Sequence, residues 1–238
     1  PDVFAPVINN GDYVGSTAGS LLPDLENKDL KVYSIASHDT AAAVSVTRAF
    51  FDPDCLFLSS GTWSLIGALS ENPILTEEAF ASDLTNETGY GGQNMFFKNI
   101  TGLYLFEKLR DELAARDGKR LNHQEADSLT VEAKPFTYFI NIADYDLDNV
   151  TVLDSVKSYI EKTGQKQPET VGEILRGLYE SLVLGYMKTV NDIERILGHR
   201  FKRIQIIGGG SKISFLNQMI ADALNKEVIA GPAEASAI

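Results

Sequence analysis

The chain of 238 residues has an ordinary globular composition, with 44% hydrophobic and 23% charged residues. It carries 33 acidic against 21 basic residues, and the formal net charge of -12 repels nucleic-acid phosphates and anionic lipid. No segment is apolar for long enough to cross a bilayer, and the chain does not open on a signal-peptide pattern. Cys55 is the only cysteine, so we expect a buried core thiol rather than a disulfide. These features predict a cytoplasmic protein that binds neither nucleic acid nor membrane.

Both ends of the sequence suggest a piece of a longer protein. Residues 1–30 are rich in Gly, Pro, Asn and Asp, which predicts an extended connecting segment with turns. The sequence starts at Pro1 without a methionine, and it stops at 235–238 inside what reads as the opening turn of a helix. We therefore expect a fragment in which residues 1–30 form a connecting segment and residues 31–238 form one domain that is cut at its end.

The first elements of that domain alternate between strand and helix. Lys31–Ala36 is predicted to be a strand, and it leads into an alanine-rich helix over Ala41–Ala49. Cys55–Leu58 and Trp63–Leu69 are predicted to be two strands. The small residues 59–62 between them favour a tight turn, so we expect a β-hairpin.

The middle of the chain is predicted to be mainly helical. Apolar residues recur at helical spacing from Ile100 to about Arg116, with Asn99 in the N-cap position. Further expected elements are a helix at Gln124–Thr130, an aromatic strand at Phe136–Ile142, and a surface insertion at 144–168 that contains a helix at Val152–Ile160.

The longest predicted helix begins at Thr170, which forms a capping-box pattern with Glu173, and Gly198 is expected to end it. A strand at Arg203–Ile207, three glycines, a helix at about 213–224 and a strand at 227–230 follow. Strands that alternate with helices predict an α/β layer architecture.

The glycine run Gly208-Gly209-Gly210 lies between a predicted strand and a predicted helix. Glycines allow close approach of a phosphate or nucleoside, and the amides at a helix start favour negative charge. Ile213 replaces the last glycine of a dinucleotide-binding motif, and no phosphate-loop motif occurs. The run therefore predicts either a nucleotide contact or only tight packing of strand on helix.

A second candidate cluster is Ser37-His38-Asp39-Thr40, placed between a predicted strand and a predicted helix. The carboxylate of Asp39 could accept a proton from a substrate hydroxyl during phosphoryl transfer. Alternatively, Asp39 or Ser37 only caps the helix. Metal binding is the poorer hypothesis, because the other histidines lie in polar helix-end contexts, and we expect no metal site.

A third candidate is the turn from Ser59 to Trp63 in the predicted hairpin. Its amides and hydroxyls could form a concave nest around phosphate oxygens. The alternative is an ordinary turn with Trp63 packed in the core.

The order of these motifs resembles the FGGY family of carbohydrate kinases, and among them the kinases of rhamnulose. The resemblance rests on His38-Asp39-Thr40, on Ser60-Gly61-Thr62-Trp63, and on the later runs Thr85-Asn86-Glu87, Lys98-Asn99-Ile100, Gly208-Gly209-Gly210 and 230–236. It spans nearly the whole chain.

The resemblance implies an actin-like, ribonuclease H-like domain with a mixed sheet flanked by helices. It also implies the following roles: Asp39 as the catalytic base, His38, Thr40 and Asn99 as substrate-binding residues, and Gly61, Thr62, Glu107, Gly209 and Gly210 as nucleotide-binding residues. At the position of Glu107 those kinases carry a glutamine, and Ser211-Lys212-Ile213 also departs from their pattern.

On this resemblance the reaction is phosphorylation of a ketose by ATP with Mg²⁺, L-rhamnulose being the first candidate and L-fuculose or a pentulose the others. The partners implied are the sugar, ATP and the missing N-terminal domain, which carries the phosphate hairpin of the family. A second hypothesis is a non-catalytic actin-like domain kept for binding or assembly, favoured by the missing half and by Glu107.

Overall fold

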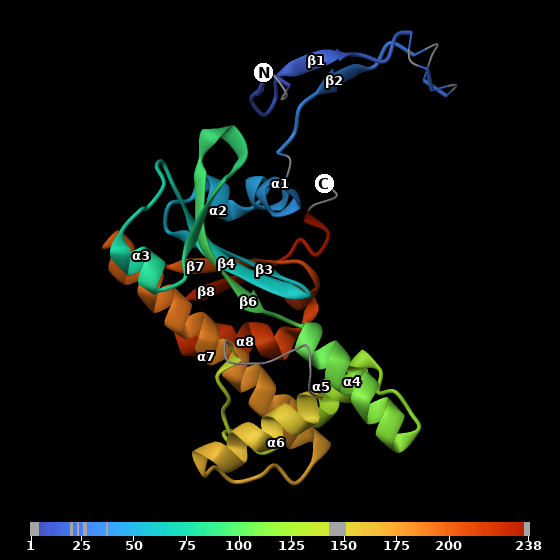
Figure 1. The fold of residues 1–238 in the computed structure, drawn as a ribbon, viewed down its shortest axis with the longest axis vertical. Coiled ribbons are helices and arrows are strands. Elements are labelled where there is room, and N and C mark those ends of the chain that lie inside the picture. The colour runs from blue at the N-terminus through green and yellow to red at the C-terminus, as the bar shows by residue number, and fades with distance from the viewer. Residues whose placement is uncertain are drawn as a thin grey trace.

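A computed structural model of the chain describes residues 5–19, 21–22, 24–25, 28–36, 38–142 and 151–235. Over these residues the body is a mixed six-stranded sheet with helices on both faces, and a separate two-stranded sheet stands away from it (Figure 1). The α/β class and the mixed sheet flanked by helices are confirmed.

The strand order of the main sheet is β5-β6-β4-β3-β7-β8. The strands are β3 (Cys55–Ser60), β4 (Trp63–Ser70), β5 (Thr85–Thr88), β6 (Asn94–Thr101), β7 (Arg203–Ile207) and β8 (Glu227–Ala230). Strands β3, β4, β6 and β5 pair antiparallel, whereas β7 is parallel to both β3 and β8. Antiparallel neighbours need only tight turns, and the parallel pair β7-β8 is joined through a helix.

Alternation along the strands gives the sheet two apolar faces. One face carries Leu58, Ile66 and Phe96 and forms the larger core with the helices α4, α5, α6, α7 and α8. The other carries Phe57 and Phe97 and packs against α1 and α2. We call these the α4 face and the α1 face.

Eight helices are described around the sheet: α1 (Asp39–Ser45), α2 (Arg48–Phe51), α3 (Glu77–Ala81), α4 (Tyr104–Asp117), α5 (His123–Glu132), α6 (Val152–Thr163), α7 (Val171–Leu197) and α8 (Ser214–Leu224). The longest, α7, runs from beside α6 along the sheet to the neighbourhood of α3 (Figure 1). Thr170 caps its start by accepting a hydrogen bond from the amide of Glu173, and Gly198 ends it with a φ of 61°.

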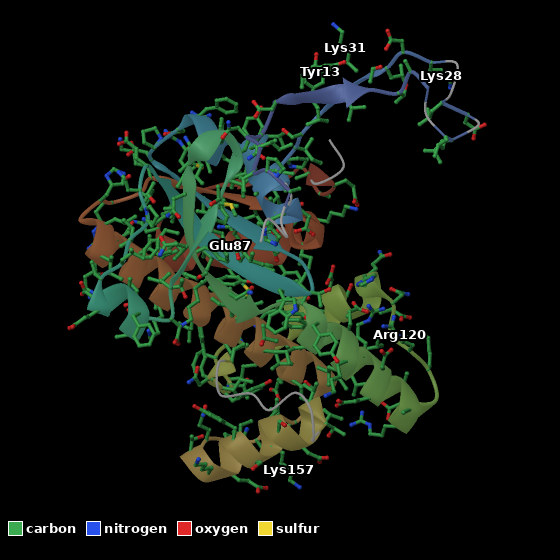
Figure 2. The ribbon with its side chains drawn as sticks, turned by 45° about the horizontal axis from the view of Figure 1, so that its top comes forward. Tyr13, Lys28, Lys31, Glu87, Arg120 and Lys157 are labelled. Carbon is green, nitrogen blue, oxygen red and sulfur yellow. The ribbon has the colours of Figure 1, made fainter. Side chains whose placement is uncertain are left out.

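The N-terminal region corrects two expectations. Part of the predicted connecting segment, Tyr13–Ser16, is strand β1, and it pairs antiparallel with β2 (Lys31–Tyr33). The predicted strand Lys31–Ala36 is therefore shorter and belongs to this hairpin instead of the main sheet. Tyr13 and Lys31 lie on it, well away from the body (Figure 2).

The alanine-rich helix predicted over Ala41–Ala49 is two helices. It begins at Asp39 and breaks at Val46 and Thr47 before α2. The hydroxyl of Thr47 donates to the carbonyl of Val44, which ends α1 locally.

Two expectations in the middle of the chain are wrong, and three elements there were not predicted. Asn99 is not an N-cap but lies inside β6, and α4 begins only at Tyr104. Phe136–Ile142 forms no strand; its backbone pairs with side chains of the core, such as Ile140 N with Ser181 Oγ at 3.0 Å. Elements α3, β5 and β6 were not predicted at all.

The remaining elements match their predicted types, with boundaries shifted by a few residues. The β3-β4 hairpin, α5, α6, α7, β7, α8 and β8 are all present. Cys55 is a free, buried thiol. Of the predicted surface insertion, 144–150 lie outside the described residues, as do Ser37 and 236–238. Within the described ranges no helix is both long and apolar enough to span a membrane.

Candidate functional site

Two turns meet at one edge of the main sheet, because β3 and β7 are parallel and end side by side. Ser59 of β3 pairs with Ile207 of β7. The chain continues from β3 into the hairpin turn at Gly61 and from β7 into the glycine turn at Gly208–Gly210. The carboxyl edge of parallel strands is where α/β proteins expose functional groups.

The three glycines of this turn have different surroundings. Gly208 has a φ of 79°, and a β-carbon there would lie 2.7 Å from the carbonyl oxygen of Ser60. A β-carbon on Gly210 would overlap the side chain of Ser60, whereas one on Gly209 would meet no atom within 4 Å. Gly208 and Gly210 therefore permit close packing on β3, while Gly209 faces open space.

Gly209 borders a cavity of about 450 Å³ on the α4 face, which we call the α4 pocket. Its walls come from α4, α5, α7 and the segment after the glycine turn, and they include Leu103, Phe106, Glu107, Asp127, Tyr179, Lys212 and Ile213. The rings of Phe106 and Tyr179 stack with centroids 3.8 Å apart. The pocket combines apolar walls with a few polar groups, as small-molecule sites do.

Glu107 is a neutralised anion in this pocket. Its two carboxylate oxygens accept hydrogen bonds of 2.7 Å from Arg110 and from Arg120. Burial alone would raise its pKa, but the hydrogen bond from Arg120 and the charge and hydrogen bond of Arg110 outweigh burial and hold the pKa below the usual value. Glu107 therefore stays ionised without presenting an uncompensated charge to a nucleotide.

Asp127 and Lys212 are the other charged groups that border the cavity near Glu107. Burial raises the pKa of the Asp127 carboxyl. Sequence reasoning missed Asp127, Arg110 and Tyr179, because each lies on a helix face where the same residue type is usual without any site. No local motif marks them.

Gly208 borders a second, smaller hollow of about 80 Å³ on the α1 face, which we call the α1 pocket. Asp39, Thr40 and Ala43 of α1 line it together with Ser59 and Ala233. The structure therefore brings the predicted base and the glycine turn together, although they are far apart in the sequence.

Asp39 is the first residue of α1, and His38 holds the N-cap position. One oxygen of the carboxylate, Oδ1, accepts the amide of Thr40 at 2.6 Å. The side chain of Asp39 is 80% exposed, so it is open to a substrate above the edge of the sheet.

The hairpin turn is tied to the start of α4. Leu103 N donates to Gly61 O at 2.8 Å and Gly102 N to Thr62 O at 3.1 Å. Gly61 N already donates to Trp63 O at 2.9 Å, so this amide is not free to join a phosphate nest. Trp63 is 52% exposed, which contradicts the alternative that it packs in the core. Thr62 is exposed at the tip of the turn.

Asn99 lies apart from the α4 pocket. It pairs with Leu65 across β4 and β6, and Leu65 packs into the core of the α1 face. Side chains of directly opposed residues share a face. Asn99 therefore lies on the same face of the sheet as Asp39 and on the opposite face from the nucleotide candidates Glu107 and Gly209.

The described residues contain no group of three or more His, Cys, Asp or Glu side chains close enough to bind a metal ion. His123 begins α5 and His199 follows α7, as expected from their polar contexts.

Comparison with known proteins identifies the class. Residues 56–238 match the model of the FGGY family of carbohydrate kinases, C-terminal domain, and the chain belongs to this family. It is similar to the rhamnulokinase of Ligilactobacillus salivarius, 35% identical over 238 residues, which are 100% of this chain and 48% of that protein.

Two further rhamnulokinases are similarly related. That of Bacillus subtilis is 35% identical over 98% of this chain and 47% of its own length, and that of Bacteroides thetaiotaomicron is 37% identical over 88% and 42%. The chain spans about half the length of the curated relatives it matches.

Solved structures agree on the fold. A xylulose kinase from Rhodospirillum rubrum superposes with a TM-score of 0.67 at 21% identity, covering 99% of this chain and 47% of that one. A glycerol kinase from Plasmodium falciparum with ADP gives 0.65 at 13% identity, covering 96% and 44%. The actin-like fold expected from the sequence is confirmed.

Proposed function

We propose that the protein containing this chain phosphorylates a ketose with ATP, L-rhamnulose being the first candidate. The carrying observation is that two hollows share one glycine turn: the α4 pocket borders Gly209, and the α1 pocket, with Asp39, borders Gly208. A nucleotide in the first would extend its phosphates over the turn toward the carboxylate in the second. The rhamnulokinase relatives support the choice of sugar.

In this proposal the α4 pocket holds the nucleoside of ATP. Leu103 and Ile213 supply apolar contacts, Gly209 leaves room for close approach, and Glu107 accepts hydrogen bonds from ribose hydroxyls. Lys212, whose amine lies 4.0 Å from Glu234 Oε1, contacts a phosphate oxygen in this proposal. Mg²⁺ would enter with the nucleotide, since this ion is usually held by substrate phosphates and only one or two carboxylates.

Asp39 acts as the general base. Its carboxylate takes the proton of the sugar hydroxyl, the hydroxyl oxygen bonds to the γ-phosphorus, and the bond to the bridging oxygen breaks so that ADP leaves with that electron pair. His38, Thr40 and Asn99 bind the sugar on the same face, and Gly61 and Thr62 flank the phosphates. Gly210 supports this arrangement through its close packing on Ser60. Phosphoryl transfer depends on positioning and charge neutralisation, so a further N-terminal domain is part of this proposal as the partner that closes the site.

A buried Cys55 agrees with a cytoplasmic protein. Burial, the largest effect, raises the pKa of its thiol to about 11, so it is unreactive as a thiolate.

The alternative of a purely non-catalytic domain rested partly on the negative charge of Glu107. That argument is weaker in the folded chain, because Arg110 and Arg120 neutralise this charge.

The test is ATP turnover by the full-length protein with a panel of ketoses: L-rhamnulose, L-fuculose and the xyluloses. We expect L-rhamnulose to give the highest kcat/KM, and Asp39→Asn to lower kcat by about 10²–10⁴-fold because the proton acceptor is lost. Thermal unfolding serves as the folding control for the variant. Retained turnover in Asp39→Asn would reject the assigned base, and a preferred pentulose would replace only the sugar.

A further inference from the structure

His38 lies between two carboxylates. Its Nδ1 is 3.1 Å from Oε2 of Glu87, and its Nε2 is 3.5 Å from Oδ1 of Asp39. The two ring nitrogens therefore face different acids, and the imidazole connects Glu87 to the candidate base. Figure 2 places Glu87 on the body of the domain, at the level of the sheet.

This arrangement comes from the tertiary fold and not from local chain geometry. His38 is the N-cap residue of α1, with φ -102° and ψ 131°, but its side chain makes no capping hydrogen bond. Glu87 belongs to β5 and pairs with Met95 of β6. Met95 is buried in the core under α1, so Glu87 lies on the α1 face, where His38 reaches it.

The proton arrangement on the ring follows from hydrogen-bond chemistry. The contact with Glu87 is a close approach of 3.1 Å, and because a carboxylate only accepts, it is attractive when Nδ1 carries a hydrogen. With the hydrogen on Nε2 alone, the Nδ1 lone pair would face the anion of Glu87. A hydrogen on Nδ1 therefore makes the contact with Glu87 attractive, and by the same reasoning a hydrogen on Nε2 makes the contact with Asp39 attractive.

The consequence appears at Asp39. Its Oδ1 accepts the amide of Thr40 at 2.6 Å and faces the imidazole of His38. Within the described residues its Oδ2 accepts no hydrogen bond. The carboxylate is thus oriented through one oxygen, and the other is left for an incoming hydroxyl.

We propose that Glu87 is a positioning residue: it accepts the Nδ1 hydrogen of His38 and holds the ring against Asp39, so that Oδ2 is the oxygen that faces the substrate. The assignment rests on the proposed function, in which Asp39 takes the sugar proton. Glu87 touches no reacting atom and acts through His38, as the third member of a nucleophile or base constellation does.

The kinetic test compares variants of the full-length protein with its best ketose. Glu87→Ala is expected to lower kcat about 10-fold with KM for ATP unchanged, in the range that outer orienting partners supply. Glu87→Gln keeps an amide oxygen that can accept from Nδ1 and should stay within about 3-fold of wild type. Glu71→Ala, an exposed acid in the turn after β4, is the control for the change in net charge.

The spectroscopic test needs no turnover. The imidazole ¹⁵N resonances of His38, identified by their loss in His38→Asn, should show a protonated Nδ1 in wild type and in Glu87→Gln. In Glu87→Ala we expect a larger fraction of the His38 imidazoles to carry their hydrogen on Nε2 than in wild type. If the protein proves inactive with every ketose, this result still decides whether Glu87 orients His38.

Three results would overturn the proposal. The first is a His38 spectrum that does not change in Glu87→Ala. The second is a changed spectrum with unchanged kcat, since the contact would then be purely structural. The third is a raised KM for the ketose at constant kcat in Glu87→Ala, which would make Glu87 a direct sugar ligand. If turnover of the ketose is the same in Asp39→Asn as in wild type, the result would instead count against the proposed function.

Discussion

At the scale of single residues, substitutions at Gly209 and Gly210 distinguish the proposed nucleotide contact from the packing of the turn on β3. Gly209→Val should leave the fold intact, because a β-carbon there meets no atom within 4 Å, but it should fill the mouth of the α4 pocket. We expect ATP affinity to fall by about 10-fold or more, equivalent to about 1.4 kcal/mol, as measured by calorimetric titration.

Gly210→Ala is the matched comparison. Its β-carbon would overlap the side chain of Ser60, so β3 and the glycine turn must move apart. We expect a loss of about 1–3 kcal/mol in the free energy of unfolding, measured with denaturant. Equal ATP affinity in Gly209→Val and wild type would contradict the site, and an unchanged stability of Gly210→Ala would contradict the packing role.

A buried ion pair links the end of α7 to the start of β8. Lys226 Nζ lies 2.6 Å from Glu194 Oε1 and 2.7 Å from Phe201 O, and the Glu194 side chain is only 3% exposed. Lys226→Met leaves this carboxylate with the exposed Arg200 as its remaining cation, so we expect a loss of about 3 kcal/mol in urea unfolding.

The matched control is Lys202→Met. That lysine pairs with Asp54 but its side chain is 69% exposed, so the loss should stay below about 1 kcal/mol. Similar losses for the two lysines would show that burial does not set the strength of these pairs.

The same carboxylate predicts a pH dependence. Burial would raise the pKa of Glu194, but hydrogen bonds from Lys226, Phe201 and Arg200 together lower it beneath the usual 4.5. A carboxyl with a lowered folded pKa adds stability above its unfolded pKa, and this stability is lost as the pH falls through the folded pKa. Unfolding free energy should therefore drop below about pH 4.5, and less steeply in Glu194→Gln; equal slopes would contradict this.

At the scale of elements, periodicity and turn signals predicted what local sequence controls. The capped helix α7, the β3-β4 hairpin and the β7-α8-β8 unit are such cases. Strand β6 was missed because its apolar run Met95, Phe96 and Phe97 is buried on both sides of the sheet and does not alternate. As a result, the last residues of β6 were wrongly included in the helix predicted from Ile100.

The candidate site likewise contains residues that a local motif marks and residues that no local motif marks. The glycine turn and Asp39 could be selected from short motifs, and the resemblance supplied their roles. Glu87 stood in one of the runs that carry the resemblance but had no predicted role, and Arg110 was not selected at all. The contacts of both depend on strands and helices that meet only in the folded chain. The surroundings that distinguish Gly209 from Gly210 are likewise tertiary.

The β1-β2 hairpin gives a prediction at this scale. Tyr13, Val14 and Tyr33 are about half exposed, and two isolated strands are marginally stable in water. Amides of this hairpin, such as that of Thr17, should exchange with deuterium much faster than those of β3 and β4.

The control for this comparison is the full-length protein, in which a packed neighbouring domain would slow exchange in the hairpin. Equal protection of the hairpin and the central strands in the 238-residue chain would show that the two strands are stable without further partners.

At the scale of the whole molecule, the sheet divides the candidate site into two compartments. The α4 pocket carries the apolar and ion-paired groups, and the α1 pocket carries Asp39 and its partners. In the proposed function, this division places the nucleoside in the α4 pocket and the proton acceptor in the α1 pocket, on opposite faces of the sheet.

The shared glycine turn has a mechanical consequence. Gly208 and Gly209 are consecutive, yet Gly208 borders the α1 pocket with the proposed base and Gly209 borders the α4 pocket, the proposed nucleotide site. A ligand that displaces the backbone of Gly208 in the α1 pocket also displaces Gly209, and so changes the wall of the α4 pocket. Any coupling would be reciprocal: the sugar would change the dissociation constant of ATP by the same factor by which ATP changes that of the sugar.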